Sequence, residues 1–168
     1  MTNTATLIAT IGPPGAGKST WCRRHAPRGS TVVNLDKNRA LVAWCHCSAN
    51  QEATPWAVEL GAVAARAVLA RGGTVVWDAT SAERASRGAL QVLAAEHGAR
   101  TVAVLILPPL AVSLARNESR DPRRCACGWS RRVPEEAIRA MDFSIRQDLR
   151  RITIGEGWHE VRHWSRRH

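Results

Sequence analysis

The stretch GPPGAGKSTW, residues 12–21, lies between an apolar segment and a segment with helical character. Gly12, Gly17, Lys18 and Ser19 match the pattern G-x-x-x-x-G-K-S/T, in which backbone N–H groups of a glycine-rich loop bind phosphate oxygens. The helix expected from Lys18 adds the positive end of its dipole. Because TLIATIG before the loop is typical of a buried strand, the motif has the strand–loop–helix context that it needs. The stretch predicts a site for a nucleoside triphosphate.

Individual residues of this loop have expected roles. Lys18 should contact the β- and γ-phosphates, and the Ser19 hydroxyl should ligate Mg²⁺. We therefore expect ATP, or another NTP, as phosphate donor and Mg²⁺ as the metal. The loop residues expected to bind the nucleotide are Gly12, Pro13, Pro14, Gly15, Ala16, Gly17, Lys18, Ser19 and Thr20.

The rest of the chain alternates short apolar strands with helical segments. Strands are expected at 6–12, 30–36, 74–80, 100–108 and 157–164, and helices at 18–25, 37–47, 54–73, 81–98 and 134–152. This alternation predicts an α/β protein with the P-loop NTPase/kinase fold, in which about five parallel strands carry helices on both faces. We expect one domain over 1–168, with an arginine-rich lid at about 116–133. In such sheets ligands bind beyond the carboxyl ends of the strands.

Composition narrows the class of protein. The chain has 24 Lys and Arg against 14 Asp and Glu, a net charge of +10. A basic surface attracts polyanions such as nucleic acid. There is no apolar run of the roughly 18 residues that cross a bilayer, and the first residues lack the pattern of a signal peptide. We therefore expect a cytoplasmic protein without a membrane partner.

Two aspartates follow predicted strands and so belong to the same edge of the sheet. Asp36 ends the second strand, and Arg39 comes one helical turn later. A carboxylate there can take the proton of an attacking hydroxyl, and an arginine can bind a phosphate on the acceptor. Asp78 ends the third strand and is a candidate for holding Mg²⁺ or orienting Arg39. For each aspartate, capping of the next helix is the alternative.

Four segments occur in an order that resembles a known family. GPPGAGKSTW, NLDKNR, VVWDAT, and LARNESR followed by RRVPEEAIRAM together resemble the kinase domain of bacteriophage and bacterial polynucleotide 5′-kinases, over most of the chain. The resemblance implies that Asp36 is the general base and that Arg39 binds a phosphate of the acceptor. It also implies that Arg116 and Arg120 clamp the donor phosphates from the lid.

The lid carries the family signature R-N-x-x-R followed by a Val-Pro helix start. Asn117, Val133 and Pro134 complete this signature, and we count Val133 with Asp36, Arg39 and Asp78 among the residues expected to bind the substrate. Between Arg120 and Val133 the chain departs from the family with DPRRCACGWSRR, a longer lid. Its arginines surround Trp129, a composition that suits a polyphosphate or a single strand.

The function that these features indicate is transfer of the γ-phosphoryl group of ATP to the 5′-hydroxyl of RNA or DNA. Lys18, Asp36, Arg116 and Arg120 are the expected catalytic residues, and no obligatory protein partner is evident. Two alternatives stay open. A small-molecule kinase, acting on an antibiotic, a sugar or a sugar nucleotide, uses the same loop. An ATP-dependent nucleic-acid-binding protein would hydrolyse ATP and transfer nothing.

Tryptophans, cysteines and two further arginines complete the candidates. Trp21, Trp56 and Trp77 are expected in the core, whereas Trp44 and Trp129 are candidates for stacking on bases. We expect Arg84 and Arg87 on the solvated face of a helix. The pairs Cys45–Cys47 and Cys125–Cys127 have spacing tighter than usual for zinc, and a helix would splay the first pair. We favour ordinary thiols, with zinc as the alternative.

Overall fold

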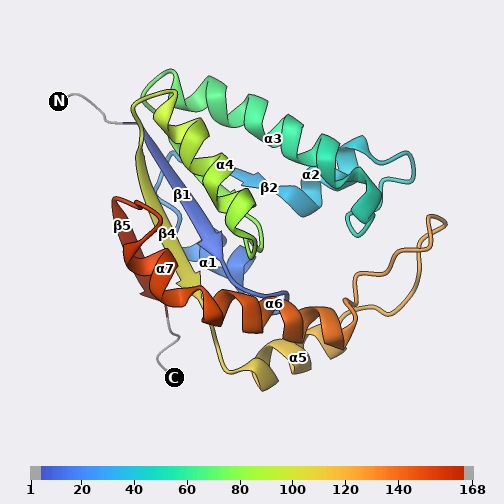
Figure 1. The fold of residues 1–168 in the computed structure, drawn as a ribbon. Coiled ribbons are helices and arrows are strands. Elements are labelled where there is room, and N and C mark those ends of the chain that lie inside the picture. The colour runs from blue at the N-terminus through green and yellow to red at the C-terminus, as the bar shows by residue number, and fades with distance from the viewer. Residues whose placement is uncertain (1–4, 165–168) are drawn as a thin grey trace.

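A parallel sheet forms the centre of the computed structural model, which describes residues 5–164 (Figure 1). Its five strands have the order β2-β3-β1-β4-β5, and every neighbouring pair is parallel. The strands are β1 Thr6–Ile11, β2 Thr31–Asn34, β3 Thr74–Asp78, β4 Arg100–Ile106 and β5 Glu160–Trp164. The predicted fold class, a P-loop kinase-like α/β sheet, is confirmed.

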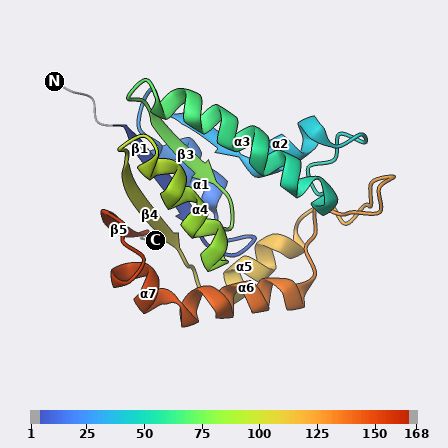
Figure 2. The ribbon, with the colours of Figure 1, turned by 45° about the horizontal axis from the view of Figure 1, so that its top comes forward.

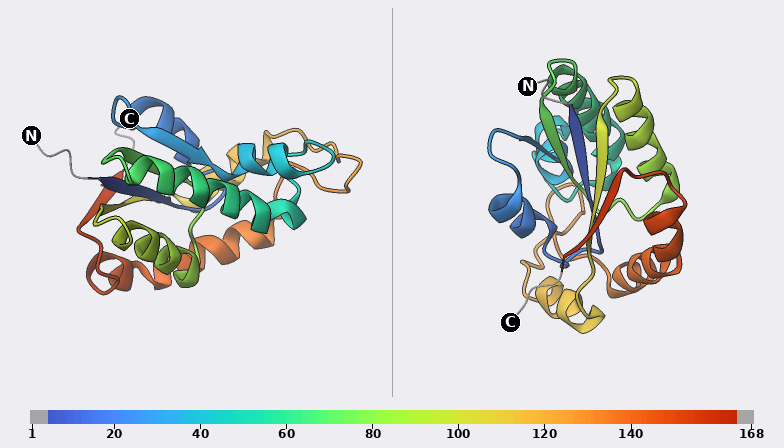
Figure 3. Two further views of the ribbon diagram at one scale, coloured as in Figure 1. Left: turned by 90° about the horizontal axis from the view of Figure 1, so that it is seen from above. Right: turned by 90° about the vertical axis from the view of Figure 1, so that its left-hand side faces the viewer.

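Helices cover both faces of this sheet because its central strands alternate apolar side chains to either side. The helices are α1 Lys18–His25, α2 Leu35–Val42, α3 Thr54–Leu69, α4 Arg84–Ala95, α5 Leu110–Glu118, α6 Glu135–Gln147 and α7 Leu149–Ile154, with a 3₁₀ turn, η1, at Gln51–Ala53. Leu7 and Ala9 pack among buried residues of α3 and α4, and Ile11 packs with residues of α6 and α7. Ile8 faces the other way, against Trp21 of α1. Figure 3 shows α1 on one side of the sheet and α4, α6 and α7 on the other.

The strand order determines where the phosphate loop lies. The loop follows β1, the central strand, whose neighbours are β3 and β4. The carboxyl ends of β2 and β3 meet beside it, since Asn34 pairs with Asp78 in the register of the two strands. The three predicted polar segments are therefore neighbours at one edge of the sheet.

The segment between α5 and α6, residues 119–134, is irregular, whereas the first residues of the predicted lid, 116–118, belong to α5. A single antiparallel bridge joins Arg124 to Ser130 near its tip. The views in Figures 1 and 2 show this loop projecting from the body of the molecule toward the loop that follows α2. The lid thus reaches the loop that follows α2, the helix that carries Asp36 and Arg39.

Three predictions about helix bounds and buried tryptophans were wrong. The predicted helix at 37–47 begins at Leu35 and ends at Val42, so Asp36 lies in the first turn of α2 and not at the end of a strand. The predicted helix at 134–152 is divided at Asp148 into α6 and α7. Trp56, expected in the core, is 60% exposed, whereas Trp21 and Trp77 are buried as predicted.

Within residues 5–164, no helix has the length and apolar character needed to cross a bilayer. Residues 1–4 lie outside the described part of the chain, and with them the start of the segment from which the lack of a signal peptide was argued.

Candidate active site

Backbone geometry explains the glycines of the phosphate loop. Gly15 and Gly17 have φ values of 82° and 105°, in the left-handed region that favours glycine. A Cβ at Gly15 would also collide with the carbonyl oxygen of Ser113. Gly17 is the N-cap of α1 and places no side chain over the first turn of that helix. The backbone N–H groups at the start of α1 can therefore bind anionic oxygens, with the positive end of the helix dipole behind them.

Lys18 lies over this loop. Its Nζ donates hydrogen bonds to the carbonyl oxygens of Gly12 and Pro13, each at 2.9 Å. Burial lowers the pKa of Lys18 to about 8, while the carboxylates of Asp78 and Asp36 oppose this shift. Lys18 is therefore mostly protonated at neutral pH, and both carboxylates lie within electrostatic reach of it.

Asp78 is buried at the end of β3, where it is 5% exposed. Its Oδ2 accepts a hydrogen bond of 2.5 Å from Nδ2 of Asn34. The next helix, α4, begins only at Arg84, so the alternative that Asp78 caps it is wrong. Asn34 also accepts a bond from the N–H of Lys37 and is the true cap of α2. Sequence reasoning missed Asn34, although an Asn before a helical segment is a common capping signal.

Asp36 and Arg39 form an ion pair on α2. The Asp36 side chain is 63% exposed, and that of Arg39 is 12% exposed. Nε of Arg39 donates a 2.8 Å hydrogen bond to the carbonyl oxygen of Ser48, in the loop after α2. Because Asn34 caps the helix, the alternative capping role for Asp36 is wrong. Arg39 holds an exposed carboxylate in place and anchors the following loop.

Arg116, in the last turn of α5 just before the lid, contacts the phosphate loop. Its Nη1 donates to the carbonyl oxygens of Gly15 and Ala16, each at 3.2 Å. Burial lowers the pKa of Arg120, and the nearby Asp36 carboxylate opposes that shift. The structure therefore brings Lys18, Asp36 and Arg120 into one electrostatic neighbourhood, although they come from α1, α2 and the lid.

Asn117 and Val133 close the base of the lid. Nδ2 of Asn117 donates to the Val133 carbonyl oxygen at 2.8 Å, and the Val133 N–H donates to Oδ1 of Asn117 at 3.0 Å. Val133 thus acts through its backbone as the partner of Asn117, and a direct contact with a substrate stays a prediction. The signal for Asn117 was its place in the R-N-x-x-R pattern.

Oxygen donors suitable for Mg²⁺ are present at the same edge. The Ser19 hydroxyl is on the first turn of α1. The Asp78 carboxylate is close enough to Lys18 to oppose the lowering of the Lys18 pKa by burial. Carboxylate and hydroxyl oxygens are the groups that hold Mg²⁺ beside a phosphate loop. Ser19 and Asp78 are therefore the residues that would hold this metal, which would supply positive charge to the phosphates of the donor.

Several solved structures have a similar fold. A chain of the Pnkp1/Rnl/Hen1 RNA repair complex superposes with a TM-score of 0.72 and 20% identity over 88% of this chain and 46% of that one. Kti12 of Chaetomium thermophilum, in complex with ADP-AlF3, gives 0.66 and 16% over 95% and 88%. Shikimate kinase from Acinetobacter baumannii, with shikimate, gives 0.53 and 19% over 98% and 87%.

These identities are too low to show more than the shared fold. The protein spans less than half of the matched chain in the RNA repair complex. Among curated proteins no sequence matches it. The family model of an AAA domain, however, matches residues 7–147, which is most of the sequence. With its phosphate loop and five-stranded parallel sheet, the chain belongs to this AAA domain family and has a P-loop kinase-like fold.

Proposed function

We propose that this protein transfers the γ-phosphoryl group of ATP to the 5′-hydroxyl of RNA or DNA. The observation that carries the proposal is the position of Asp36. Its exposed carboxylate is fixed by Arg39 and lies within electrostatic reach of Lys18 and Arg120. A base fixed beside the donor phosphates is the arrangement that transfer to a hydroxyl requires. An ATPase that transfers nothing has no need for an arginine holding such a carboxylate.

Each residue then has a chemical role. Lys18 exchanges its bonds to Gly12 and Pro13 for the β- and γ-phosphates of ATP. Asp36 accepts the proton as the acceptor oxygen bonds to the γ-phosphorus. The bond from that phosphorus to the β–γ bridging oxygen breaks, and ADP leaves. Arg120 stabilises the charge on the transferring group, a contribution of about 10³–10⁵ in rate in the best cases.

The exposed side chains of the lid support the proposal that the acceptor is a polyanion. Arg123, Arg124 and Arg131 are exposed in it, on a chain whose net charge is +10. Trp129 is 37% exposed and Trp44, in the facing loop, is 74% exposed. Arginines that contact a phosphate backbone, together with exposed aromatic rings that stack on bases, form the usual binding surface for single-stranded nucleic acid. The similarity in fold to a chain of an RNA repair complex agrees with this acceptor.

Labelled ATP and a set of acceptors test the proposal. A 5′-hydroxyl oligonucleotide and a 3′-phosphorylated nucleoside should be phosphorylated, and a bare nucleoside should be a poor acceptor. Asp36→Asn should lower turnover by about 10²–10⁴-fold with little change in acceptor affinity, because only the base is lost. Glu59→Gln, which neutralises an exposed carboxylate of α3, is the matched control and should keep full activity.

Substitution of Arg39 helps to distinguish a polynucleotide kinase from a small-molecule kinase. Arg39→Ala should lower turnover for every acceptor, since Arg39 holds Asp36. It should also weaken binding only for acceptors with a phosphate beside the reactive hydroxyl, where a charge-assisted hydrogen bond is lost. A native enzyme that prefers a free nucleoside or a sugar over the 3′-phosphorylated nucleotide would be a small-molecule kinase, and the proposal would be wrong.

A further inference from the structure

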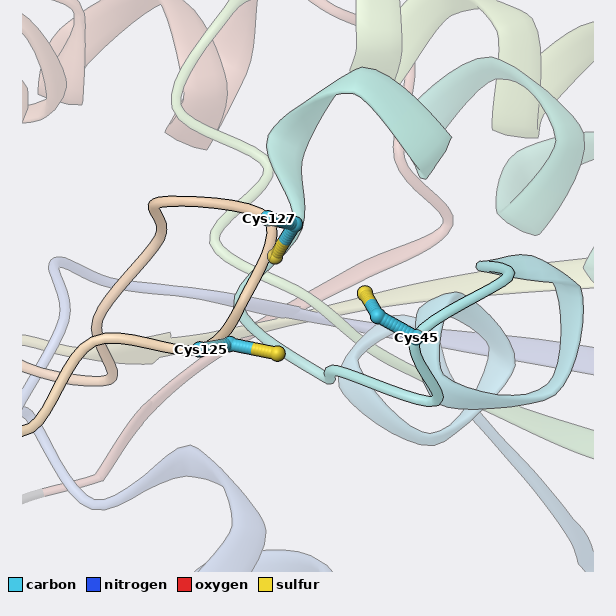
Figure 4. A group of neighbouring side chains, drawn as sticks. All are labelled: Cys45, Cys125 and Cys127. Carbon is cyan, nitrogen blue, oxygen red and sulfur yellow. The ribbon is translucent and has the colours of Figure 1, made fainter.

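Two cysteine pairs far apart in the sequence meet in the structure. The sulfur atoms of Cys45, Cys125 and Cys127 all lie within 4.8 Å of one another, between the loop after α2 and the tip of the lid (Figure 4). The fourth thiol, of Cys47, lies two residues from Cys45 on the same loop, outside this group of three but near Cys125 and Cys127. The objection raised from sequence, that a helix would splay the first pair, does not hold because α2 ends at Val42.

The first pair lies in a turn that brings both side chains toward the lid. His46, between the two cysteines, has a φ of 51°, an uncommon value for a residue other than glycine. Its ring Nδ1 lies 3.2 Å from the Ala40 carbonyl oxygen and so is directed back to α2. Nδ2 of the buried Asn50 contacts the Cys45 sulfur at 3.9 Å. The turn therefore presents thiols as ligands, supported by an amide donor.

The second pair lies in a small hairpin at the tip of the lid. The N–H of Cys125 donates to the Trp129 carbonyl oxygen, and the N–H of Gly128 donates to that of Cys125, each at 2.8 Å. Gly128 has a φ of 82° and allows the tight turn. The hairpin therefore places the sulfurs of Cys125 and Cys127 beside that of Cys45.

We propose that Cys45, Cys47, Cys125 and Cys127 bind one Zn²⁺ ion in a tetrahedral thiolate site. A Zn–S bond of about 2.3 Å places tetrahedral sulfurs about 3.8 Å apart, so the sulfurs of Cys45, Cys125 and Cys127 need to approach one another by at most about 1 Å, and Cys47 supplies the fourth ligand. Sulfurs this close together suit a single ion. Four thiolates and Zn²⁺ carry a net charge of −2, and the exposed Arg124 directly before Cys125 adds opposite charge at the tip of the lid.

The site explains how a long irregular lid is held in place. Loops of more than about 12 residues without regular structure are uncommon in compact domains unless they are functional. The lid carries exposed arginines and has no apolar cluster of its own among the described residues. A zinc ion would bind its tip to the loop whose Ser48 anchors Arg39. The lid arginines and the Asp36–Arg39 pair would then be fixed relative to each other.

Metal content and cobalt substitution test the site. The reduced protein, purified without chelator, should contain about one zinc per chain by mass spectrometry, as a site of this type predicts. Replacement by Co²⁺ should give sulfur-to-cobalt charge-transfer bands and the visible bands of tetrahedral coordination. Cys45→Ser and Cys127→Ser, one from each loop, should each lower zinc affinity at least about tenfold. Cys22→Ala, which removes a buried thiol of the core, should keep the metal.

Proteolysis tests the connection between the loops. Removal of zinc by a strong chelator should speed trypsin cleavage after Arg123, Arg124 and Arg131, with cleavage after the exposed Arg71 unchanged. A folded, reduced protein that takes up neither zinc nor cobalt would overturn the proposal, as would iron in place of zinc or binding that survives both serine variants. Unchanged cleavage after zinc removal would overturn the role in holding the lid. None of these measurements depends on which acceptor is phosphorylated.

Discussion

Replacing Arg87 by Met should cost about 3–5 kcal/mol of the free energy of unfolding, because it leaves a buried charge without its partner. The Arg87 side chain has no solvent exposure, although sequence analysis placed it on a solvated face. It donates to Glu156 at 2.6 and 2.8 Å and to Asp148 at 3.0 Å. It also donates to the backbone carbonyl oxygens of Ser81 and Ala82, just before α4. Methionine keeps the apolar stem of the side chain, so the loss is chiefly electrostatic.

The magnitude follows from what stays behind. The Glu156 side chain is 5% exposed. Without Arg87, the side-chain donor that the structure still gives it is the Trp158 indole N–H, at 3.2 Å. Asp148 is 23% exposed and can be solvated in part. A loss of about 3–5 kcal/mol corresponds to a fall in melting temperature of about 6–20 °C for a domain of this size. This is a large part of the about 5–15 kcal/mol that stabilises a typical protein.

Urea unfolding followed by circular dichroism measures the effect, with the free energy obtained by linear extrapolation. Arg84→Met, one turn earlier on the exposed face of α4, is the control and should change stability by less than about 0.5 kcal/mol. Adding Glu156→Gln to Arg87→Met should restore part of the loss, since it removes the stranded charge. A loss below about 1 kcal/mol for Arg87→Met, or no recovery in the double variant, would refute the reasoning.

Two further predictions concern the donor side. The affinity for ATP should fall as the pH rises through about 8, because Lys18 loses its proton there, and Lys18→Met should bind weakly without this pH dependence in nucleotide titrations on either side of pH 8. Arg116→Ala, which loses the bonds to Gly15 and Ala16, and Arg120→Ala should lower single-turnover rates more than oligonucleotide affinity. A loss confined to oligonucleotide affinity would instead assign Arg116 and Arg120 to binding of the acceptor.

The donor side of the site could be predicted from sequence because its geometry is local. The glycines, Lys18 and Ser19 lie within eight consecutive residues, and the backbone angles at Gly15 and Gly17 explain the pattern. The strands were also predictable, since buried parallel strands are continuous apolar runs. Arg87 was not, because its carboxylate partners lie 61 and 69 residues away and its surroundings on α4 resemble those of an exposed arginine. The burial of Trp56 was also predicted wrongly, because the spacing of apolar residues along a helix does not show which face of the helix lacks a neighbouring element.

The acceptor side could be predicted only in part, because its geometry depends on contacts between distant segments. Asp36 was identified, but its placement on α2 follows from the Asn34 cap, which also bonds to Asp78 of another strand. Arg39 was expected to face a substrate, yet its contacts are with Asp36 and with the Ser48 carbonyl oxygen. Ser48 follows the cysteines that meet the tip of the lid. A displacement of that loop would move Arg39, and with it the Asp36 carboxylate that Arg39 holds. Loss of the proposed zinc ion should therefore disturb the position of Asp36 before it disturbs binding of the donor phosphates.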